Sequence, residues 1–381
     1  MKNFIPSLLI LPVIALLSCA SQDGDEVPVG SVVPPETLTV AVEDTIGLMM
    51  GDSSYVFGNI TEAEIGPEGN IYVLDGLLCR LSIFSPEGEH LGSTGRAGSG
   101  PGEYQYPRSM ALYEDGSLVI SDWPGATITY LQPDLSFDTV LATFGQLSPH
   151  SVEPLPGGEY VGGGLEYRTG GEMPEGDLFL ARYGRAVDPK AVLWRSPLMI
   201  DVVMENGEAE VYISNADAVW DTSPDGVVYL TVRSDSTWWF MGMSQEGDTL
   251  LYLDRDWERV PKSPEELAMG EYMESLSFSD NSSTSISRRR DTENVIPWRQ
   301  AISSIDVDDQ GRIWLGQGWR DQPVFEVYDE EGSLLFVAAV PALAGTDGIE
   351  YSIRGSRIVG YDTEPMDYPK VYLMDIGTLE D

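Results

Sequence analysis

The strongest constraint on the fold is a unit of two short strands that recurs six times along the 381-residue chain. Each copy opens with a turn that carries Gly, continues with a β-branched or aromatic strand, and reaches a second strand after a short loop. The copies occupy residues 67–88, 114–135, 157–183, 225–247, 309–332 and 354–377. In four of them a second Gly follows the first by 19 to 22 residues, as Gly226 and Gly247 illustrate. This regular spacing predicts one supersecondary unit copied six times.

The strands of the repeat alternate between polar and apolar residues, as residues 325–328 (Phe-Glu-Val-Tyr) show. This pattern suits a sheet that packs against neighbouring sheets. The 40 Gly and 25 Pro supply turns for many short strands. Stacking such sheets around an axis protects most strand edges, which is the physical advantage of a β-propeller. We therefore expect an all-β fold, a six-bladed β-propeller, over residues 37–381.

The ring needs one strand from elsewhere in the chain. The sixth unit ends after residues 371–376, before an outer strand could form. Residues 38–42 (Leu-Thr-Val-Ala-Val) alternate like a strand and precede the first unit. We expect this N-terminal strand to close the ring by pairing with the last blade.

Two intervals in the repeat are longer than the others and predict insertions. The first contains Asn206-Gly207, a favoured tight turn, and predicts a hairpin. The second, about residues 256–300, contains Ser263-Pro264-Glu265-Glu266, which has the N-cap, N1 and N3 residues of a helix start. Apolar residues at one-face spacing follow, so we expect a short amphipathic helix, and then a polar loop over residues 279–294.

The N-terminus reads as an export signal. Residues 1–18 contain Lys2 and then a nearly continuous apolar stretch that is too short for a comfortable bilayer span. Leu16-Leu17-Ser18-Cys19 resembles the bacterial lipobox, in which the Cys receives a lipid, although an ordinary cleaved signal is the alternative. Ala20 follows Cys19, and by that resemblance the destination is the outer membrane, with the protein in the periplasm or at the cell surface. Residues 19–36 are then a flexible tether.

One further motif resembles a known family. Residues 95–104 (Gly-Arg-Ala-Gly-Ser-Gly-Pro-Gly-Glu-Tyr), followed by Pro107, resemble the inter-blade signature of NHL-type propellers, and residues 80–84 look like the third strand of that family. The chain is thus similar to six-bladed, NHL-repeat-like propellers, in particular their bacterial lipoprotein members. The similarity spans roughly residues 60–380, and its sharp motif occurs once.

Charge and residue counts exclude several classes of function. The chain has 22 basic and 62 acidic residues, a net charge of −40, which disfavours nucleic acid as a partner. Its cysteines are Cys19 and Cys79, so no disulfide framework or thiolate metal cluster remains once Cys19 is lipidated. With His90 and His150 as the two histidines, a His-rich metal site is excluded and a Ser-His-Asp triad disfavoured. We expect Cys79 to be a packed small residue.

The best hint of a binding site is a set of arginines and aromatic residues in a chain that is otherwise acidic. In a propeller, the loops from outer to next inner strand and from second to third strand share one face, here called the loop face. This plan gathers on it the candidate ligand-binding residues Arg96, Tyr104, Arg108, Trp123, Arg168, Arg233, Trp298, Arg299, Trp319, Arg320 and Tyr361. Guanidinium groups bind carboxylate or sulfate, and aromatic faces stack on sugars or apolar groups.

An alternative reading of these arginines is structural. They could pair with acids such as Asp75, Glu103 and Asp321 and lock loops together, and Arg80, at a strand end, fits that role best. Under the functional reading, the ligand is an anionic small molecule, a peptide or a glycan, or the partner is a protein.

We therefore expect a lipid-anchored binding protein with no catalytic residues. The alternative is a calcium-dependent hydrolase or lactonase, because the resemblance implies a channel metal held by Glu, Asn and Asp, and the chain has acids that suit calcium. Asn is sparse on the predicted inner strands, and we expect no Glu-to-Asn-to-Asp series at matching positions and no metal site or cofactor. Acid pairs such as Asp308-Asp309 are expected to stay solvated in turns. Three or four oxygens converging in the channel would favour the enzyme, and a rim of Arg and Trp without such a cage would favour binding.

Overall fold

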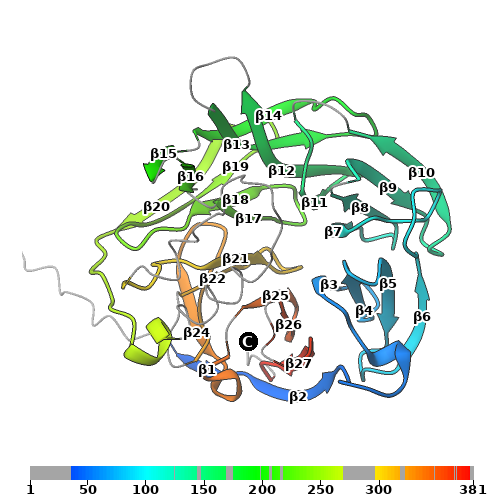
Figure 1. Cartoon of the computed structure of the whole chain (residues 1–381). Coiled ribbons are helices and arrows are strands. Elements are labelled where there is room, and N and C mark those ends of the chain that lie inside the picture. Colours follow the sequence, from blue (N-terminus) through cyan, green and yellow to red (C-terminus); the bar gives the residue numbers. More distant parts are fainter. Residues whose placement is uncertain are drawn as a thin grey trace, which may run out of the picture. The chain divides into compact units, whose positions relative to one another are not determined.

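The chain folds into six sheets arranged in a ring, each with four antiparallel strands that run in order from the channel to the rim (Figure 1). This confirms the predicted six-bladed β-propeller. The structure, a computed structural model, describes residues 36–377 apart from 124, 144–146, 169–174, 198, 206–207, 215–217, 269–296, 318–321, 347, 364 and 366. The predicted signal peptide, Cys19 and residues 19–35 of the tether lie outside the described residues. No helix in the described part of the chain is long and apolar enough to span a membrane.

The first three blades follow the chain order. The first consists of β3 (Ile60–Ile65), β4 (Ile71–Asp75), β5 (Arg80–Phe84) and β6 (His90–Thr94). The second consists of β7 (Pro107–Leu112), β8 (Leu118–Asp122), β9 (Thr127–Leu131) and β10 (Phe137–Ala142). The third consists of β11 (Ser151–Leu155), β12 (Glu159–Arg168), β13 (Glu175–Tyr183) and β14 (Ala191–Pro197).

The last three blades complete the ring. The fourth consists of β17 (Ala218–Thr222), β18 (Val228–Val232), β19 (Trp238–Met243) and β20 (Thr249–Arg255). The fifth consists of β21 (Ser304–Val307), β22 (Ile313–Gly316), β23 (Val324–Tyr328) and β24 (Leu334–Ala339). The sixth consists of β25 (Ile349–Arg354), β26 (Arg357–Asp362), β27 (Val371–Asp375) and the N-terminal β2 (Ala41–Ile46). Two 3₁₀ turns, η1 (Ser53–Tyr55) and η3 (Pro341–Leu343), lie in connections.

The N-terminal strand closes the ring, as predicted, but it is divided between two blades. β2 pairs antiparallel with β27, whereas β1 (Thr37–Thr39) pairs in parallel with β24 of the fifth blade. Val40 lies between them, donates its N–H to the Ala339 carbonyl at 2.8 Å, and is 1% exposed. Its side chain belongs to a core cluster that contains residues of the fifth and sixth blades. The single strand expected over residues 38–42 is thus a seam that joins both blades.

The turns explain the glycines that mark the repeat. Gly226 has φ +84° and donates its N–H to the Ser223 carbonyl at 2.8 Å, so it closes the turn between β17 and β18. A Cβ atom there would lie 3.0 Å from Cδ of Pro156 and closer still to Gln245. Glycine is therefore required both by the left-handed backbone and by the space.

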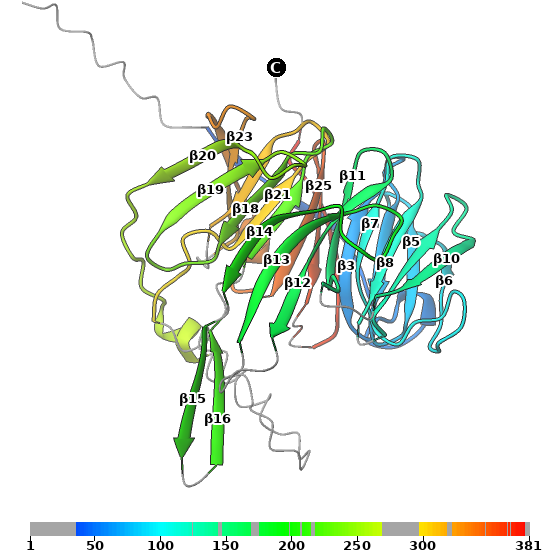
Figure 2. The ribbon, with the colours of Figure 1, turned by 90° about the horizontal axis from the view of Figure 1, so that it is seen from above.

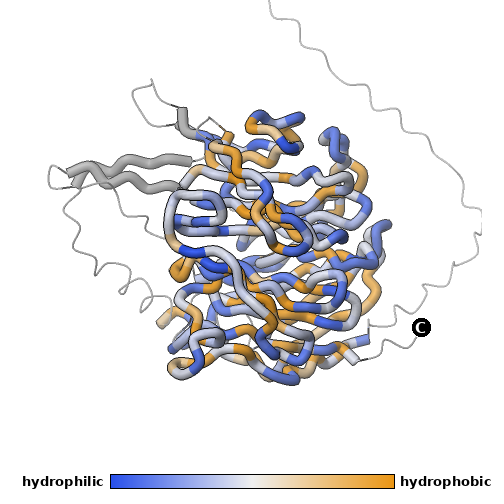
Figure 3. Tube along the Cα trace, turned by 90° about the vertical axis from the view of Figure 1, so that its right-hand side faces the viewer, coloured by the Kyte–Doolittle hydropathy of each residue, from blue (hydrophilic) through white to orange (hydrophobic). Residues whose placement is uncertain are grey.

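The core consists of apolar clusters between neighbouring blades, because strands such as β8 and β22 are buried along their whole length. Figure 3 shows hydrophobic segments interspersed with hydrophilic ones through the molecule. Trp314 shows this best: it is fully buried between the fifth and sixth blades, with its ring 6.0 Å from that of Phe325 and 5.6 Å from that of Phe336. Truncation of a buried Trp to Ala typically lowers the free energy of unfolding by about 3–5 kcal/mol.

Asp308 corrects one expectation. It does not stay solvated in its turn but is fully buried. Its carboxylate accepts hydrogen bonds from Trp314 Nε1 at 3.0 Å, from Arg312 Nε at 2.6 Å, and from the N–H groups of Gln310 and Arg312 at 2.9 and 3.0 Å. The neighbouring Asp309 is exposed. A turn that supplies several donors can thus bury one member of an acidic pair.

The first insertion is the predicted hairpin. β15 (Met199–Glu205) pairs antiparallel with β16 (Glu208–Ser214), and Figure 2 shows this hairpin extending away from the blades. Asn206 and Gly207, which were expected to form its turn, lie outside the described residues.

The second insertion begins with the predicted helix start. Residues 264–268 are helical. The N–H of Glu266 donates to Ser263 Oγ at 3.2 Å, and the N–H of Ser263 donates back to the Glu266 carboxylate. This reciprocal pair is the capping box that the sequence indicates. The rest of the expected helix and the polar loop lie outside the described residues.

Candidate functional site

The centre of the ring holds a cavity of about 1140 Å³, lined by the innermost strands of all six blades. These strands are β3, β7, β11, β17, β21 and β25, and each presents side chains toward the axis. The cavity is therefore the place where the fold brings together residues that are far apart in the chain.

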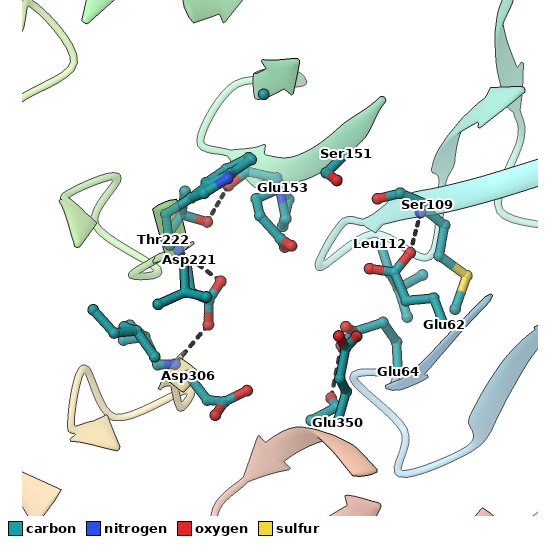
Figure 4. Close-up of a pocket in the computed structure, with 18 of the residues that line it drawn as sticks. Glu62, Glu64, Ser109, Leu112, Ser151, Glu153, Asp221, Thr222, Asp306 and Glu350 are labelled. Atoms are coloured by element: carbon teal, nitrogen blue, oxygen red, sulfur yellow. Dashed lines mark hydrogen bonds between the residues drawn. The ribbon is translucent and has the colours of Figure 1, made fainter. Parts of the chain in front are cut away.

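Six carboxylates from five blades point into this cavity (Figure 4). They are Glu62, Glu64, Glu153, Asp221, Asp306 and Glu350. None of the six has an ion-pair partner within the described part of the chain.

Four of the six acids share one register. Glu64, Glu153, Asp221 and Asp306 each lie opposite the residue eight positions later, on the second strand of the same blade. Ala111 of the second blade has the same pairing, opposite the residue eight positions later on β8. The fold therefore places these four carboxylates at one depth in the channel. Only a mixed Glu-to-Asn-to-Asp series was considered from the sequence, and this series of acids alone was not foreseen.

The first-blade carboxylates are held by neighbouring blades. Glu62, 8% exposed, accepts the N–H of Met110 in the second blade. Glu64 Oε2 accepts a hydrogen bond from Ser352 Oγ in the sixth blade at 2.7 Å, and Ser352 Oγ accepts the N–H of Ile65 at 3.2 Å. These bonds fix the direction of both side chains.

On the opposite side of the channel, Asp221 joins two blades. Its two oxygens accept the N–H groups of Thr222 and of Val307, both at 2.6 Å. Asp306, on the neighbouring strand, accepts a hydrogen bond from Ser304 Oγ at 3.1 Å.

Two carboxylates are less constrained. Glu350 is exposed to the channel and accepts a hydrogen bond from the hydroxyl of Tyr361 at 3.1 Å. Glu153 has no hydrogen-bond or ion-pair partner among the residues that the structure describes. It is the carboxylate most available to a ligand.

The enclosed, acidic surroundings favour the neutral forms of these groups. Burial raises the pKa of Glu64 to about 8 and that of Asp221 to about 7. Burial, together with the neighbouring carboxylates, raises the pKa values of Glu62, Glu153 and Asp306 well above their ordinary range. Near neutral pH the channel therefore holds protons that a bound cation would displace.

The carboxylates do not form a metal cage. Carboxylate oxygens are the donor type that calcium prefers, but calcium needs about six to eight oxygens at roughly 2.3–2.6 Å. Among the described residues no group of three or more His, Cys, Asp or Glu side chains is arranged to hold one ion. The arrangement suits a larger cation that meets several carboxylates spread around it.

Three of the residues predicted from the sequence line the same cavity: Arg108, Arg233 and Tyr361. Arg108 is exposed on β7, and Arg233 donates from Nε to the Ser303 carbonyl at 3.0 Å. His150 also lines the cavity, and burial together with the charge of Arg108 lowers the pKa of His150 to about 4. A basic group of residues thus accompanies the acidic channel.

Trp123 is connected to this basic group. It is 44% exposed, and its ring lies 5.2 Å from that of His150. It does not itself line the cavity.

Other predicted residues lie elsewhere. Arg96 pairs with Glu103, with Nε 2.8 Å from Oε1, and Tyr104 is a core residue at 1% exposure. Arg299 pairs with Glu266 at 2.8 Å beside the helix start. These two pairs match the structural reading of the arginines.

Of the remaining predicted residues, one has described contacts, and the side chains of the other three lie outside the described residues. Trp298 forms an isolated bridge with Pro261 and lies 5.9 Å from the guanidinium of Arg259. Arg168 ends β12, but its side chain lies outside the described residues, as do Trp319 and Arg320.

Arg80 holds a loop, as its strand-end position suggests. It donates to the carbonyls of Ser53 at 3.0 Å and Val56 at 2.7 Å. Cys79 is 3% exposed and packs in the core, as expected.

The sequence carried a signal for the channel acids that was missed. Glu64, Glu153, Asp221 and Asp306 each stand five residues before the turn glycine of their unit: Gly69, Gly158, Gly226 and Gly311. Aligning the repeat on its glycines would have found them. In a chain with 62 acidic residues they were not distinctive one by one.

Comparison with known proteins adds little to this picture. No family model matches the sequence, and no curated protein matches it. Among solved structures, a Bacteroides fragilis protein described as exported is 13% identical with a TM-score of 0.49, covering 90% of this chain and 99% of its own. Virginiamycin B lyase from Staphylococcus aureus is 7% identical with a TM-score of 0.46 over 88% and 99% of the two chains. Regucalcin, a calcium-binding protein from Agrobacterium tumefaciens, is 11% identical with a TM-score of 0.39 over 91% and 98%. All three TM-scores are below 0.5, and the propeller fold rests on the strand order described above.

Proposed function

We propose that this protein is a ligand-binding propeller, anchored outside the cytoplasm by a lipid on Cys19, and that its central channel takes up a positively charged ligand. The observation that carries the proposal is the layer formed by Glu64, Glu153, Asp221 and Asp306 in a cavity of about 1140 Å³.

The electrostatic argument has two steps. Carboxylates gathered in an enclosed channel without ion-pair partners among the described residues destabilise one another's ionised forms. A cation that enters relieves this repulsion and gains several charge-assisted interactions, whereas an anion would add to it. The channel therefore selects positive charge.

The size of the cavity favours an organic cation over a metal ion. Its carboxylates surround a space far larger than one ion, and no three of the described acids are arranged to hold one ion. The calcium-dependent hydrolase or lactonase, considered above as an alternative, would require such a cage. The residues present do not fit it, and we derive no catalytic step.

The cellular location is supported by the N-terminal residues. Lys2, the apolar stretch that follows and the lipobox-like Leu16-Leu17-Ser18-Cys19 form an export and lipidation signal. The outer membrane, with the propeller in the periplasm or at the cell surface, is the proposed destination.

A second candidate function is the binding of an anionic ligand, which is the ligand class expected from the sequence. Arg108 lines the cavity, is exposed, and has no ion-pair partner in the described part of the chain. An anionic group of a small molecule, peptide or glycan could bind to it together with Arg233.

Equilibrium dialysis with two oppositely charged probes tests the two candidates. Spermidine, a polycation, should bind at pH 8, and citrate should not. Glu153→Gln and Asp306→Asn should each weaken spermidine binding by about tenfold, as expected for the loss of one charge-assisted contact. Glu331→Gln, at an exposed surface carboxylate, is the matched control. Binding of citrate that is lost in Arg108→Ala, with no binding of spermidine, would reject the first candidate in favour of the second.

A further inference from the structure

The channel cavity continues sideways between the third and fourth blades, and we call this part the side cleft. One wall is a row of residues that face one another across the third blade: Ser151 pairs with Gly163, Gly163 with Leu180, and Leu180 with Trp194. All four line the cavity. The row begins on the innermost strand and ends on the outermost, so the cleft leads from the channel toward the rim.

The next row along the same face is also apolar. Leu165 pairs with Leu178, and both line the cavity. Side chains two residues apart on a strand share a face, so these leucines extend the wall that Leu180 begins.

Gly163 provides the space for the opposite wall. Trp220 of the fourth blade lines the cavity, and its indole lies directly on this glycine. A Cβ atom on Gly163 would be 3.0 Å from Cζ2 and 3.1 Å from Nε1 of Trp220. The φ of Gly163 is not positive, so its backbone does not require glycine. The missing side chain lets the indole of Trp220 pack directly against this strand, so that Trp220 forms the wall beside Gly163 and Leu180.

The inner entrance of the side cleft is acidic. Glu153 follows Ser151 by two residues on the same strand, and Asp221 directly follows Trp220. The two residues lie on β11 and β17, the innermost strands of neighbouring blades, and burial together with the charge of Asp221 raises the pKa of Glu153. Figure 4 shows Ser151, Glu153 and Asp221 on one side of the channel.

We infer that the ligand is an amphipathic organic cation, a protonated amine or quaternary ammonium that carries an apolar or aromatic body. The charged group lies between Glu153 and Asp221, and the body lies in the side cleft against Leu180, Trp194 and Trp220. This inference rests on the proposed function of the channel. Charge complementarity selects this occupant, because an uncharged apolar molecule would leave the carboxylates at the entrance without a partner.

Aromatic walls suit both parts of such a ligand. Indole faces attract cations and pack well against flat apolar groups. Burial of a phenyl-sized body adds apolar area that a bare ammonium lacks.

Calorimetric titration with three probes measures separately how much the charge and the apolar body of the ligand contribute to affinity. 2-Phenylethylammonium should bind about tenfold or more tightly than ethylammonium, because it fills the cleft. 2-Phenylethanol, which has the same body without the charge, should bind at least about tenfold more weakly than 2-phenylethylammonium. Equal binding of the alcohol, or no advantage of the phenyl group, would overturn the inference.

Two cleft variants locate the body. Trp194→Ala and Leu165→Ala should each weaken 2-phenylethylammonium binding several-fold and leave spermidine binding unchanged, since spermidine needs only the channel acids. Both residues are half-buried, and a melting curve of each variant verifies its fold. If 2-phenylethylammonium binds equally well to both variants while spermidine still binds, the cleft assignment is wrong and the channel proposal stands. If spermidine does not bind to the wild-type protein, the channel proposal itself fails.

Discussion

The carboxylate of Asp221 accepts the backbone N–H of Val307 at 2.6 Å, and this bond connects the innermost strands of the fourth and fifth blades. The other oxygen accepts the N–H of Thr222 at the same distance. Asp221 is thus both a channel acid and a structural link. The propeller uses the same side chain to hold its ring together and to line its channel with an acidic group.

Asp221→Ala should destabilise the protein. It leaves two backbone N–H groups without their acceptor, at a cost of about 1–3 kcal/mol in the free energy of unfolding. Urea denaturation measures this change. Glu331→Ala, at an exposed site, should have almost no effect, and equal stability of the Asp221 variant would show that the link is not needed.

Stability should fall as pH rises from about 5 to 8.5. Burial raises the pKa of Glu64 to about 8 and that of Asp221 to about 7 in the folded protein. The folded state therefore binds more protons than the unfolded state in this window, and this contribution is complete below the ordinary carboxyl pKa and lost through pH 7–8. Acids such as the exposed Asp52 and the half-buried Glu103, whose pKa values are lowered by hydrogen bonds, titrate at more acidic pH and do not act in this window.

Melting temperatures at constant ionic strength test this pH dependence. The wild-type protein should melt several degrees lower at pH 8.5 than at pH 5.5, and Glu64→Gln should reduce the difference. A melting temperature that rises over this interval would contradict the raised pKa values.

The N-terminal seam should be essential for stability. Val40 is 1% exposed in the core shared by the fifth and sixth blades, so Val40→Asp places a charge where no partner exists. The expected loss is large, about 3 kcal/mol or more. Glu43→Gln, at an exposed position of β2, is the matched control. A melting temperature within a degree or two of wild type for Val40→Asp would argue against closure by this strand.

Cys19 should carry the membrane anchor. Cys19→Ala should abolish incorporation of a radiolabelled fatty acid and shift the protein from the membrane to the soluble fraction. Cys79→Ala changes the other cysteine, which is buried, and should leave labelling unchanged. Labelling that persists without Cys19 would disprove the proposed lipidation.

The sequence specifies the fold well because its signals are local. In the sequence, each blade contains a turn glycine between two strands in which polar and apolar residues alternate. Gly226 and Gly311 occupy positive-φ turns, as the repeat predicts. The reciprocal hydrogen bonds of Ser263 and Glu266 form the capping box, which the sequence shows as a Ser and a Glu three positions apart. Such signals need no knowledge of the rest of the chain.

The site depends on contacts between distant segments and was predicted only in part. The propeller plan placed Arg108, Arg233 and Tyr361 on the loop face, and the structure places all three in the lining of the channel cavity. The plan could not show that Tyr104 would be buried in the core. The register of a strand also decides whether an acid faces the channel, and that register is marked in the sequence by the distance of the acid from the turn glycine rather than by the acid itself.

Calorimetric titration of spermidine at pH 8, in two buffers with different ionisation enthalpies, tests the channel proposal most directly, because it counts protons released on binding. The account predicts that the wild-type protein binds spermidine and releases protons from its channel carboxylates, and that Glu64→Gln combined with Glu153→Gln and Asp306→Asn loses both the binding and the release. The account would be contradicted if the wild-type protein did not bind spermidine. It would also be contradicted if spermidine bound without proton release and still bound to the triple variant.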